Sequence, residues 1–190
     1  MRIVDLSHKF SLEEYLKDRH SGTHIDAPAY VLNGGKRVGD LGLERFICDA
    51  VLLDLSRKRP GEAIDDEDLE AAEETAGVAV REGEAVLLHT GVSNTPLQAV
   101  LQPPNVYLSR NGAEYLEFKG VSLVGADLGS IDDVKSSDLV AHRTLLGRGI
   151  LILEGLCNLD AIDSVRFRLA SFPLNLSSAT SPVRAVAMVD

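Results

Sequence analysis

The chain of 190 residues has no tryptophan, two cysteines and no long apolar run, and each shortage argues against a class of protein. No apolar stretch approaches the roughly 20 residues that a bilayer-spanning helix needs, so we expect no membrane association. The N-terminal stretch lacks the apolar core of a signal peptide, so we expect a cytoplasmic protein. Cys48 and Cys157 lie far apart in apolar surroundings and are interpreted as small core residues, with no disulfide required.

Positive charge is also scarce. Lysine and arginine number 19 against 29 acidic residues, which gives a net charge of −10. Nucleic acid is therefore not an expected partner, because phosphate binding needs a basic face. Eight carboxylates gather between Glu62 and Glu74, and we interpret this run as the solvated face of a helix.

The length and the 45% hydrophobic fraction fit one globular domain spanning residues 1–190. Short apolar runs alternate with helical patterns, which predicts an α/β domain with a mixed sheet. Gln102, Pro103 and Pro104 are expected to form a break between elements of secondary structure. The expected strands are 2–6, 50–55, 85–89, 121–124, 149–153, 166–176 and 183–189. The expected helices are 65–76, ended by Gly77; 109–116, capped by Ser109; and one capped by Ser136 or Ser137 that reaches residue 146.

The segment 20–28, HSGTHIDAP, carries most of the expected chemistry. His20, His24 and Asp26 place two imidazoles and one carboxylate within seven residues, a donor set that suits zinc, manganese or iron. In an extended stretch, positions 24 and 26 project to the same face, and Gly22 would let His20 turn toward the same point. The alternative is that these histidines are surface or hydrogen-bonded residues, because short motifs often match by chance.

A second pair of candidates lies further along the chain. Glu154 follows directly after the apolar strand 149–153, where a buried carboxylate needs a partner, and His142 lies on the helix before that strand. A metal would be a suitable partner for both. The alternatives are a salt bridge from Glu154 to Arg143 or Arg148, and a helix position for His142 near the C-terminus, where the dipole favours a cation.

Four segments of the chain resemble the putative cyclase family, which includes bacterial kynurenine formamidases and isatin hydrolases. The segment 20–28 looks like the family signature H-x-G-T-H-x-D-x-P. The segments 125–132 (GADLGSID), 141–162 and 181–188 (SPVRAVAM) are similar to later family motifs, in the same order. The resemblance implies the swivelling β/β/α fold of that family, and dimers or tetramers.

The resemblance also implies roles for single residues. His20, His24 and Asp26 match the primary metal ligands, and His142 and Glu154 match residues that complete a second site. We therefore expect zinc, with manganese as the alternative, as one or two ions. The family carries a catalytic histidine two residues after the proline, but this chain has Tyr30 there. A phenol is a poor base at neutral pH, so Tyr30 is expected to assist as a hydrogen-bond donor, with Glu154 helping in catalysis.

A second departure lies at the N-terminus, where only 13 residues separate Leu6 from His20. Family members usually carry aromatic substrate contacts in a longer segment there, so the usual aromatic pocket is in doubt.

The favoured function is metal-dependent hydrolysis of an amide or cyclic amide, such as an arylformamide, a lactam or an imide, by metal-activated water. The alternative is a metal-binding relative that has lost catalysis and acts as a binding or scaffold protein, which Tyr30 and the short N-terminal segment favour. A serine hydrolase is disfavoured because the chain has no G-x-S-x-G motif and Ser130 has no evident base beside it. The expected partner is a small-molecule substrate.

Overall fold

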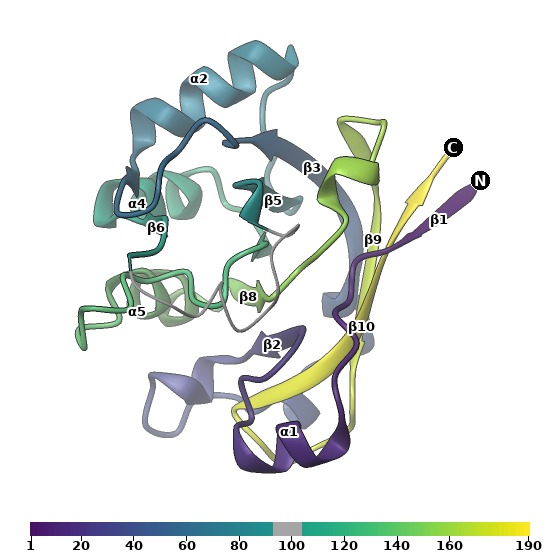
Figure 1. Cartoon of the computed structure of the whole chain (residues 1–190). Helices are drawn as coiled ribbons and strands as arrows, with labels where there is room; N and C mark the ends of the chain where they lie inside the picture. Colours follow the sequence, from purple (N-terminus) through teal and green to yellow (C-terminus); the bar gives the residue numbers. More distant parts are fainter. Residues whose placement is uncertain (93–103) are drawn as a thin grey trace.

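Eight strands form one mixed sheet in the computed structural model, which describes residues 1–92 and 104–190 (Figure 1). The strand order is β1-β10-β2-β8-β7-β5-β3-β9, and β9 also pairs with β10. Seven strands therefore close into a barrel-like ring, with β1 added beside β10. The strands are β1 (Arg2–Asp5), β2 (His24–Asp26), β3 (Ile47–Asp54), β5 (Ala85–His89), β7 (Leu123–Ala126), β8 (Leu151–Glu154), β9 (Arg166–Pro173) and β10 (Thr180–Val189).

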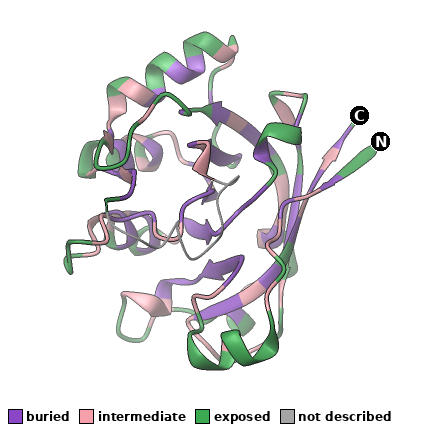
Figure 2. Ribbon diagram, in the orientation of Figure 1, coloured by how far each residue is buried: buried purple, intermediate pink, exposed green. Residues whose placement is uncertain are grey.

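The parallel half of the ring consists of β3, β5, β7 and β8. Its strands are apolar on both faces because both faces are covered. On β5, Val86 and Leu88 pack in the core beneath the helices, whereas Ala85 and Leu87 belong to the core inside the ring. The helices that cover this half lie on its outer side (Figures 1 and 2). They are α2 (Asp66–Ala76), α4 (Arg110–Phe118) and α5 (Val140–Gly147).

The antiparallel half consists of β2, β9 and β10, which connect the two ends of the parallel half. Smaller elements decorate this frame. They are α1 (Leu12–Lys17), the paired strands β4 (Ala63–Ile64) and β6 (Tyr107–Leu108), and the 3₁₀ turns η1 (Pro28–Tyr30), η2 (Val38–Asp40), η3 (Leu43–Phe46) and η5 (Leu159–Ala161). Among the described residues, no helix is long and apolar enough to cross a bilayer.

Most expected elements are confirmed, with shifted ends. The prediction of β5 matches its observed bounds, and α2 ends at Gly77, whose φ is 65°. Ser109 caps α4 by accepting a hydrogen bond from the Gly112 amide. Gln102 and Pro103, where a break between elements of secondary structure is expected, lie outside the described residues.

Two expectations are wrong. The helix before β8 is not capped by Ser136 or Ser137 but begins at Val140, because the Asp132 carboxylate accepts hydrogen bonds from the Ala141 and His142 amides. The acidic run on α2 is not wholly solvated, since Glu73 is buried and hydrogen-bonded.

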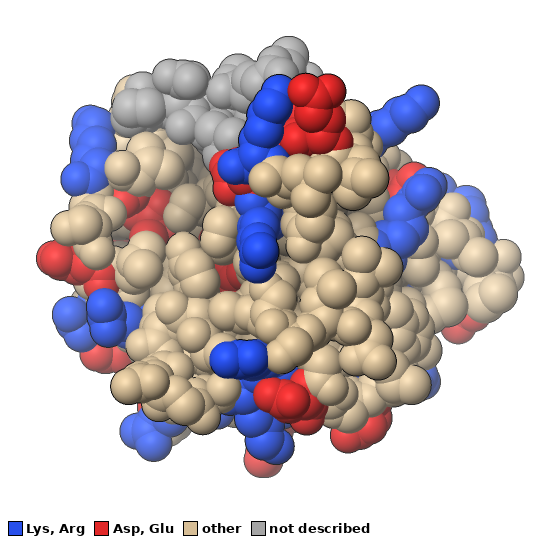
Figure 3. Space-filling model, turned by 90° about the horizontal axis from the view of Figure 1, so that it is seen from below, with Lys and Arg blue, Asp and Glu red and all other residues tan. Residues whose placement is uncertain are grey.

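Charges of both signs are interspersed on the face of the molecule seen from below (Figure 3). Lysines and arginines there lie among acidic side chains, with uncharged surface between them. That face therefore presents no continuous basic surface.

Candidate metal centre

The short strand β2 carries the first group of candidate ligands. It lies between β8 and β10, and His24 is opposite Glu154 in the antiparallel register with β8. His24 and Asp26 project to one face of the strand, while Ile25 packs into the core inside the ring. Gly22, with φ of 75°, turns the preceding loop so that His20 returns to the same face. The sequence prediction that these three side chains converge is confirmed.

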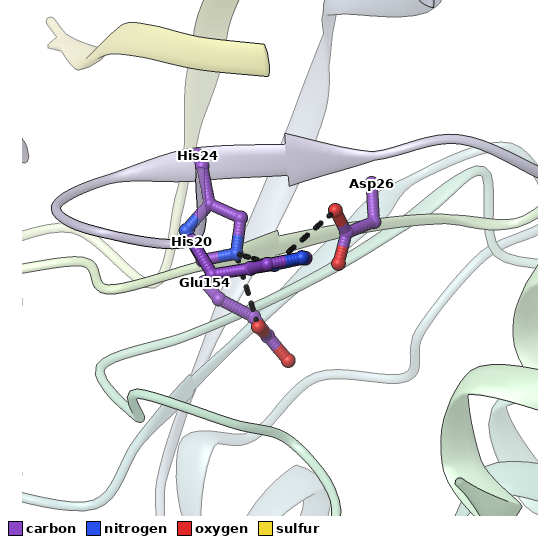
Figure 4. Close-up of side chains that lie close together, drawn as sticks. All are labelled: His20, His24, Asp26 and Glu154. Carbon is purple, nitrogen blue, oxygen red and sulfur yellow. Dashed lines mark hydrogen bonds and ion pairs between the residues drawn. The ribbon is translucent and has the colours of Figure 1, made fainter. Parts of the chain in front are cut away.

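Glu154 completes a compact group with these residues (Figure 4). The His24 Nε2 lies 3.2 Å from Glu154 Oε2, and the His20 Nδ1 lies 3.1 Å from His24 Nε2. The His20 Nδ1 is 3.9 Å from Asp26 Oδ1. One donor atom from each of the four residues lies within 4.8 Å of all the others. Such spacing allows one cation to contact all four.

His142 reaches the same group from α5. Its Nε2 lies 3.4 Å from Asp26 Oδ2 and 3.4 Å from Glu154 Oε1. The alternatives considered from sequence are wrong. Arg148 pairs with Glu117 and Arg143 donates to the Asp138 carbonyl, while His142 lies in the first turn of α5, away from its C-terminus.

Two imidazoles are held so that one nitrogen faces the centre. The His24 Nδ1 lies 3.0 Å from the Gly22 carbonyl oxygen, which can only accept a hydrogen bond, so Nδ1 donates. The His142 Nδ1 lies 2.6 Å from Asp132 Oδ2 in the same arrangement. In the neutral tautomers this leaves the lone pair of each Nε2 directed at the carboxylates, which is the orientation of metal-ligating histidines.

The Asp26 carboxylate is fully buried, and neither of its oxygens accepts a hydrogen bond from any residue that the structure describes. A buried carboxylate without hydrogen bonds is costly unless a cation faces it. Glu154 is only partly satisfied, because Oε1 accepts from the Ile131 amide while Oε2 faces His24. Imidazole nitrogens and carboxylate oxygens at this spacing therefore fit a divalent transition metal.

The protonation equilibria of the site reflect the same concentration of negative charge. Burial alone would lower the pKa of His24, but Glu154 and Asp26 outweigh it and raise that pKa to about 9. For His142, burial is likewise outweighed by Glu154, Asp132 and Asp26, and the pKa rises to about 10. The neighbouring imidazoles overcome the burial of Asp26 and lower its pKa. The carboxylates thus favour cationic neighbours, a role that protons or a metal can fill.

Tyr30 stands at the edge of the group. Its ring centroid is 5.0 Å from that of His20 and 5.2 Å from that of His142. Burial and the nearby charges of Asp26 and Glu154 raise the pKa of Tyr30 to about 12. The side chain thus lies beside the candidate ligands, as its position after the motif predicts, and keeps its proton at neutral pH.

Asp132 is the site residue that sequence reasoning missed. It both caps α5 and holds His142, ten residues later in the chain. The available signal was an acidic residue within the GADLGSID segment, shortly before a helix whose start was placed at Ser136 or Ser137.

The sequence is similar to a family model and to named proteins. The family model described as "Putative cyclase" matches residues 4–133. A kynurenine formamidase of Geobacillus thermodenitrificans is 38% identical over 168 residues, which cover 87% of this chain and 74% of that protein. A kynurenine formamidase of Bacillus cereus is 36% identical over 168 residues, covering 88% and 75% of the two chains.

Solved structures share the fold over nearly the whole chain. Isatin hydrolase A from Labrenzia aggregata, bound to benzyl benzoate, superposes with a TM-score of 0.85 at 23% identity, covering 99% of this chain and 93% of that one. A protein from Bacillus stearothermophilus described as a predicted metal-dependent hydrolase gives a TM-score of 0.76 at 22% identity, covering 98% and 97%. At these identities the superpositions establish the architecture alone.

Proposed function

Because this chain belongs to the putative cyclase family, we propose that it is a metal-dependent hydrolase that cleaves the C–N bond of a small amide. The substrate class is an arylformamide, a lactam or an imide. One observation carries the proposal: the buried Asp26 carboxylate has no hydrogen-bond partner in the described part of the chain and lies among His20, His24 and Glu154. The curated relatives, named as kynurenine formamidases, support the reaction type.

His20, His24 and Asp26 would hold the first cation, which we propose to be zinc, with manganese as the alternative. His142 and Glu154 would complete a site for a second ion, since both contact the region around Asp26. A divalent cation at this place lowers the pKa of a coordinated water and polarises a carbonyl oxygen. The side chains needed to hold it converge from β2 and the loop before it, from α5 and from β8.

The protein's own groups would move the protons. Glu154 would accept the proton of the attacking water, because its Oε2 has no amide partner. Tyr30 would donate its phenolic proton in a hydrogen bond to the oxyanion that develops on the carbonyl. Water adds to the carbonyl carbon, the C–N bond breaks, and the amine leaves with the transferred proton.

The test combines metal content with turnover. Wild type and His24→Ala are purified and analysed for bound metal, and both are assayed on a panel of formamides, lactams and imides. We expect His24→Ala to lose most metal and turnover. His89→Ala is the matched control, because His89 lies near Asp54 and outside the ligand group, by which we mean His20, His24, Asp26 and Glu154.

Full metal occupancy in His24→Ala would contradict the assignment of His24 as a ligand. Metal binding by wild type without turnover of any panel member would favour the alternative, a metal-binding protein that has lost catalysis. The observation that favours this alternative is Tyr30, which stands where the family has its catalytic histidine.

A further inference from the structure

A hollow of about 740 Å³ opens beside the candidate metal centre. Segments 29–37 and 177–180 line most of it. His20 and Tyr30 also line it, and His20 belongs at the same time to the ligand group. A molecule in this hollow would therefore lie next to the place where the chemistry is proposed.

The charge of the hollow is opposite to that of the chain. Arg19 and Arg37 line it, and none of the described residues that line it is acidic, although the chain carries 29 acidic residues against 19 basic ones. The neighbouring carboxylates are already engaged with main-chain amides. Asp18 accepts from the His20 amide and Asp40 from the Arg37 amide.

Neither guanidinium group has a carboxylate partner among the described residues. Arg37 donates from Nη1 to the Ser177 hydroxyl at 2.9 Å, and the Arg19 side chain has no hydrogen bond or ion pair among residues 1–92 and 104–190. A guanidinium group has five donors in a planar fork that matches a carboxylate. Both arginines are therefore free to bind an anion.

Thr180 provides an independent indication of a ligand. It lines the hollow, is only 4% exposed, and its Oγ1 has no hydrogen-bond partner among the described residues. Thr180 pairs with Asp26 in the register of β10 with β2, so its side chain lies on the same face of the sheet as the Asp26 carboxylate. Buried hydroxyl groups are normally satisfied, and a bound molecule could satisfy this one.

We propose that this hollow is an anion subsite, and that Arg19 and Arg37 bind the carboxylate of a substrate whose amide lies at the metal centre. This inference rests on the proposed function and narrows it to amides that carry an acidic group. Charge-assisted hydrogen bonds from guanidinium to carboxylate give both affinity and orientation. The two arginines thus determine specificity and take no part in bond cleavage.

The experiment uses the metal-loaded protein and two matched sets of probes. Hydrolysis is measured on 2-, 3- and 4-formamidobenzoate and on the corresponding neutral formamidobenzamides. Binding of the aminobenzoates and aminobenzamides, which cannot be hydrolysed as formamides, is measured by calorimetry. The variants are Arg19→Gln, Arg37→Gln and the double variant, with Arg81→Gln as the control because Arg81 is exposed and outside the hollow.

We expect wild type to prefer at least one acid over its neutral amide by about 10- to 100-fold in kcat/KM and in Kd, the range for hydrogen bonds to a charged group. The double variant should lose this preference while retaining bound metal and activity on neutral probes, and Arg81→Gln should keep it. Raising the salt concentration should weaken the preference in wild type.

Equal kcat/KM and Kd values for acids and neutral amides in wild type would overturn the anion subsite. A preference for the acids that survives in the double variant would overturn it too. A different pattern separates the two proposals. If no formamide is hydrolysed but aminobenzoates bind in preference and the double variant loses that binding, the subsite is supported and the hydrolase proposal fails.

Discussion

At the scale of single residues, Asp132 decides which nitrogen of His142 is free. Its Oδ2 accepts from the His142 Nδ1, so the Nε2 lone pair faces Asp26 and Glu154. The Asp132 carboxylate, which does not itself face the candidate cation, thereby fixes the tautomer and orientation of the His142 imidazole, which does.

We predict that Asp132→Asn weakens metal binding about 10- to 100-fold, the range for such outer partners. The asparagine oxygen can still cap α5, which directs the amide NH₂ group toward His142 Nδ1 and forces the proton onto Nε2. Metal titration against a competing chelator measures this. Asp133→Asn is the control, since the Asp133 carboxylate lies outside the site and, among the described residues, accepts a hydrogen bond only from the Lys135 amide. Unchanged affinity in Asp132→Asn would show that the tautomer of His142 does not matter.

Tyr30 gives the second prediction at this scale. If the protein is an enzyme, Tyr30→Phe should lower kcat by roughly 10- to 1,000-fold, as expected for one lost oxyanion donor, and leave metal content unchanged. Tyr30→His should be tolerated, because the family carries histidine at this position. The measurement is kcat on whichever amide is turned over. Full activity of Tyr30→Phe would reduce Tyr30 to a packing residue between His20 and His142.

Sequence identified single residues well where they share a short segment. The spacing of His20, His24 and Asp26 predicted a convergence that the structure shows. His142 and Glu154 were found because a buried carboxylate after an apolar strand needs a partner. Asp132 and Thr180 were not found, because their roles depend on contacts between elements that no local pattern records.

At the scale of elements, Glu73 connects α2 to α4. Tyr115 donates to its Oε1 at 2.7 Å, while the Val80 amide and Lys119 donate to Oε2 at 2.8 and 3.0 Å. Burial alone would raise the pKa of Glu73, but these hydrogen bonds outweigh it and lower that pKa below its usual value. The ionised form therefore stabilises the contact between the two helices.

We predict that Glu73→Gln lowers the free energy of unfolding at pH 7 by roughly 1.5–3 kcal/mol, the range for hydrogen bonds to a charged group. A lowered pKa means that the stabilisation is present above the pKa of the unfolded chain, about 4.5, and is lost as pH falls through the folded pKa. Urea unfolding at pH 7 and near pH 3.5 should show the difference shrinking on acidification. Glu74→Gln, at an exposed neighbour, should show neither effect.

Long, strongly patterned elements were predictable from sequence and short ones were not. The apolar run of β5 and the capped, glycine-terminated α2 have local signals that the structure confirms. The three-residue strand β2 has no such signal, because its extended form is held by β8 and β10. The start of α5 was misplaced because its cap comes from Asp132, seven residues before Leu139.

At the scale of the whole molecule, the candidate ligands bring together parts of the chain that are far apart in sequence. They come from β2 and the loop before it, from α5 and from the end of β8. A cation bound there would therefore contact the folded chain and not the unfolded one, so it should stabilise the entire fold.

We predict that metal removal by chelation lowers Tm by roughly 5–10 °C relative to protein with metal at about 100 times its Kd. Calorimetric scans with and without zinc measure the shift. His24→Ala should unfold at a temperature that added zinc changes little, whereas the His89→Ala control should respond as wild type does. An identical Tm for wild type with and without chelator would contradict the proposed site.

The mixed α/β architecture was predictable, but the closure of the ring was not. The apolar pattern of a strand predicts which of its faces are buried, but it does not predict which strands lie beside it. Closure depends on β10, whose ten residues pair with β1, β2 and β9 at once. Only the register of these three ladders shows that the sheet returns on itself.

This same placement of β10 has a consequence for the order of biosynthesis. Within the part of the chain that the structure describes, the strand β2, which carries His24 and Asp26, pairs with β8 and β10, and both are translated more than 120 residues later. At typical synthesis rates of about 5–20 residues per second, His24 and Asp26 leave the ribosome on the order of ten seconds before their neighbouring strands exist. Binding of the proposed cation is therefore expected only after β8 and β10 have been made.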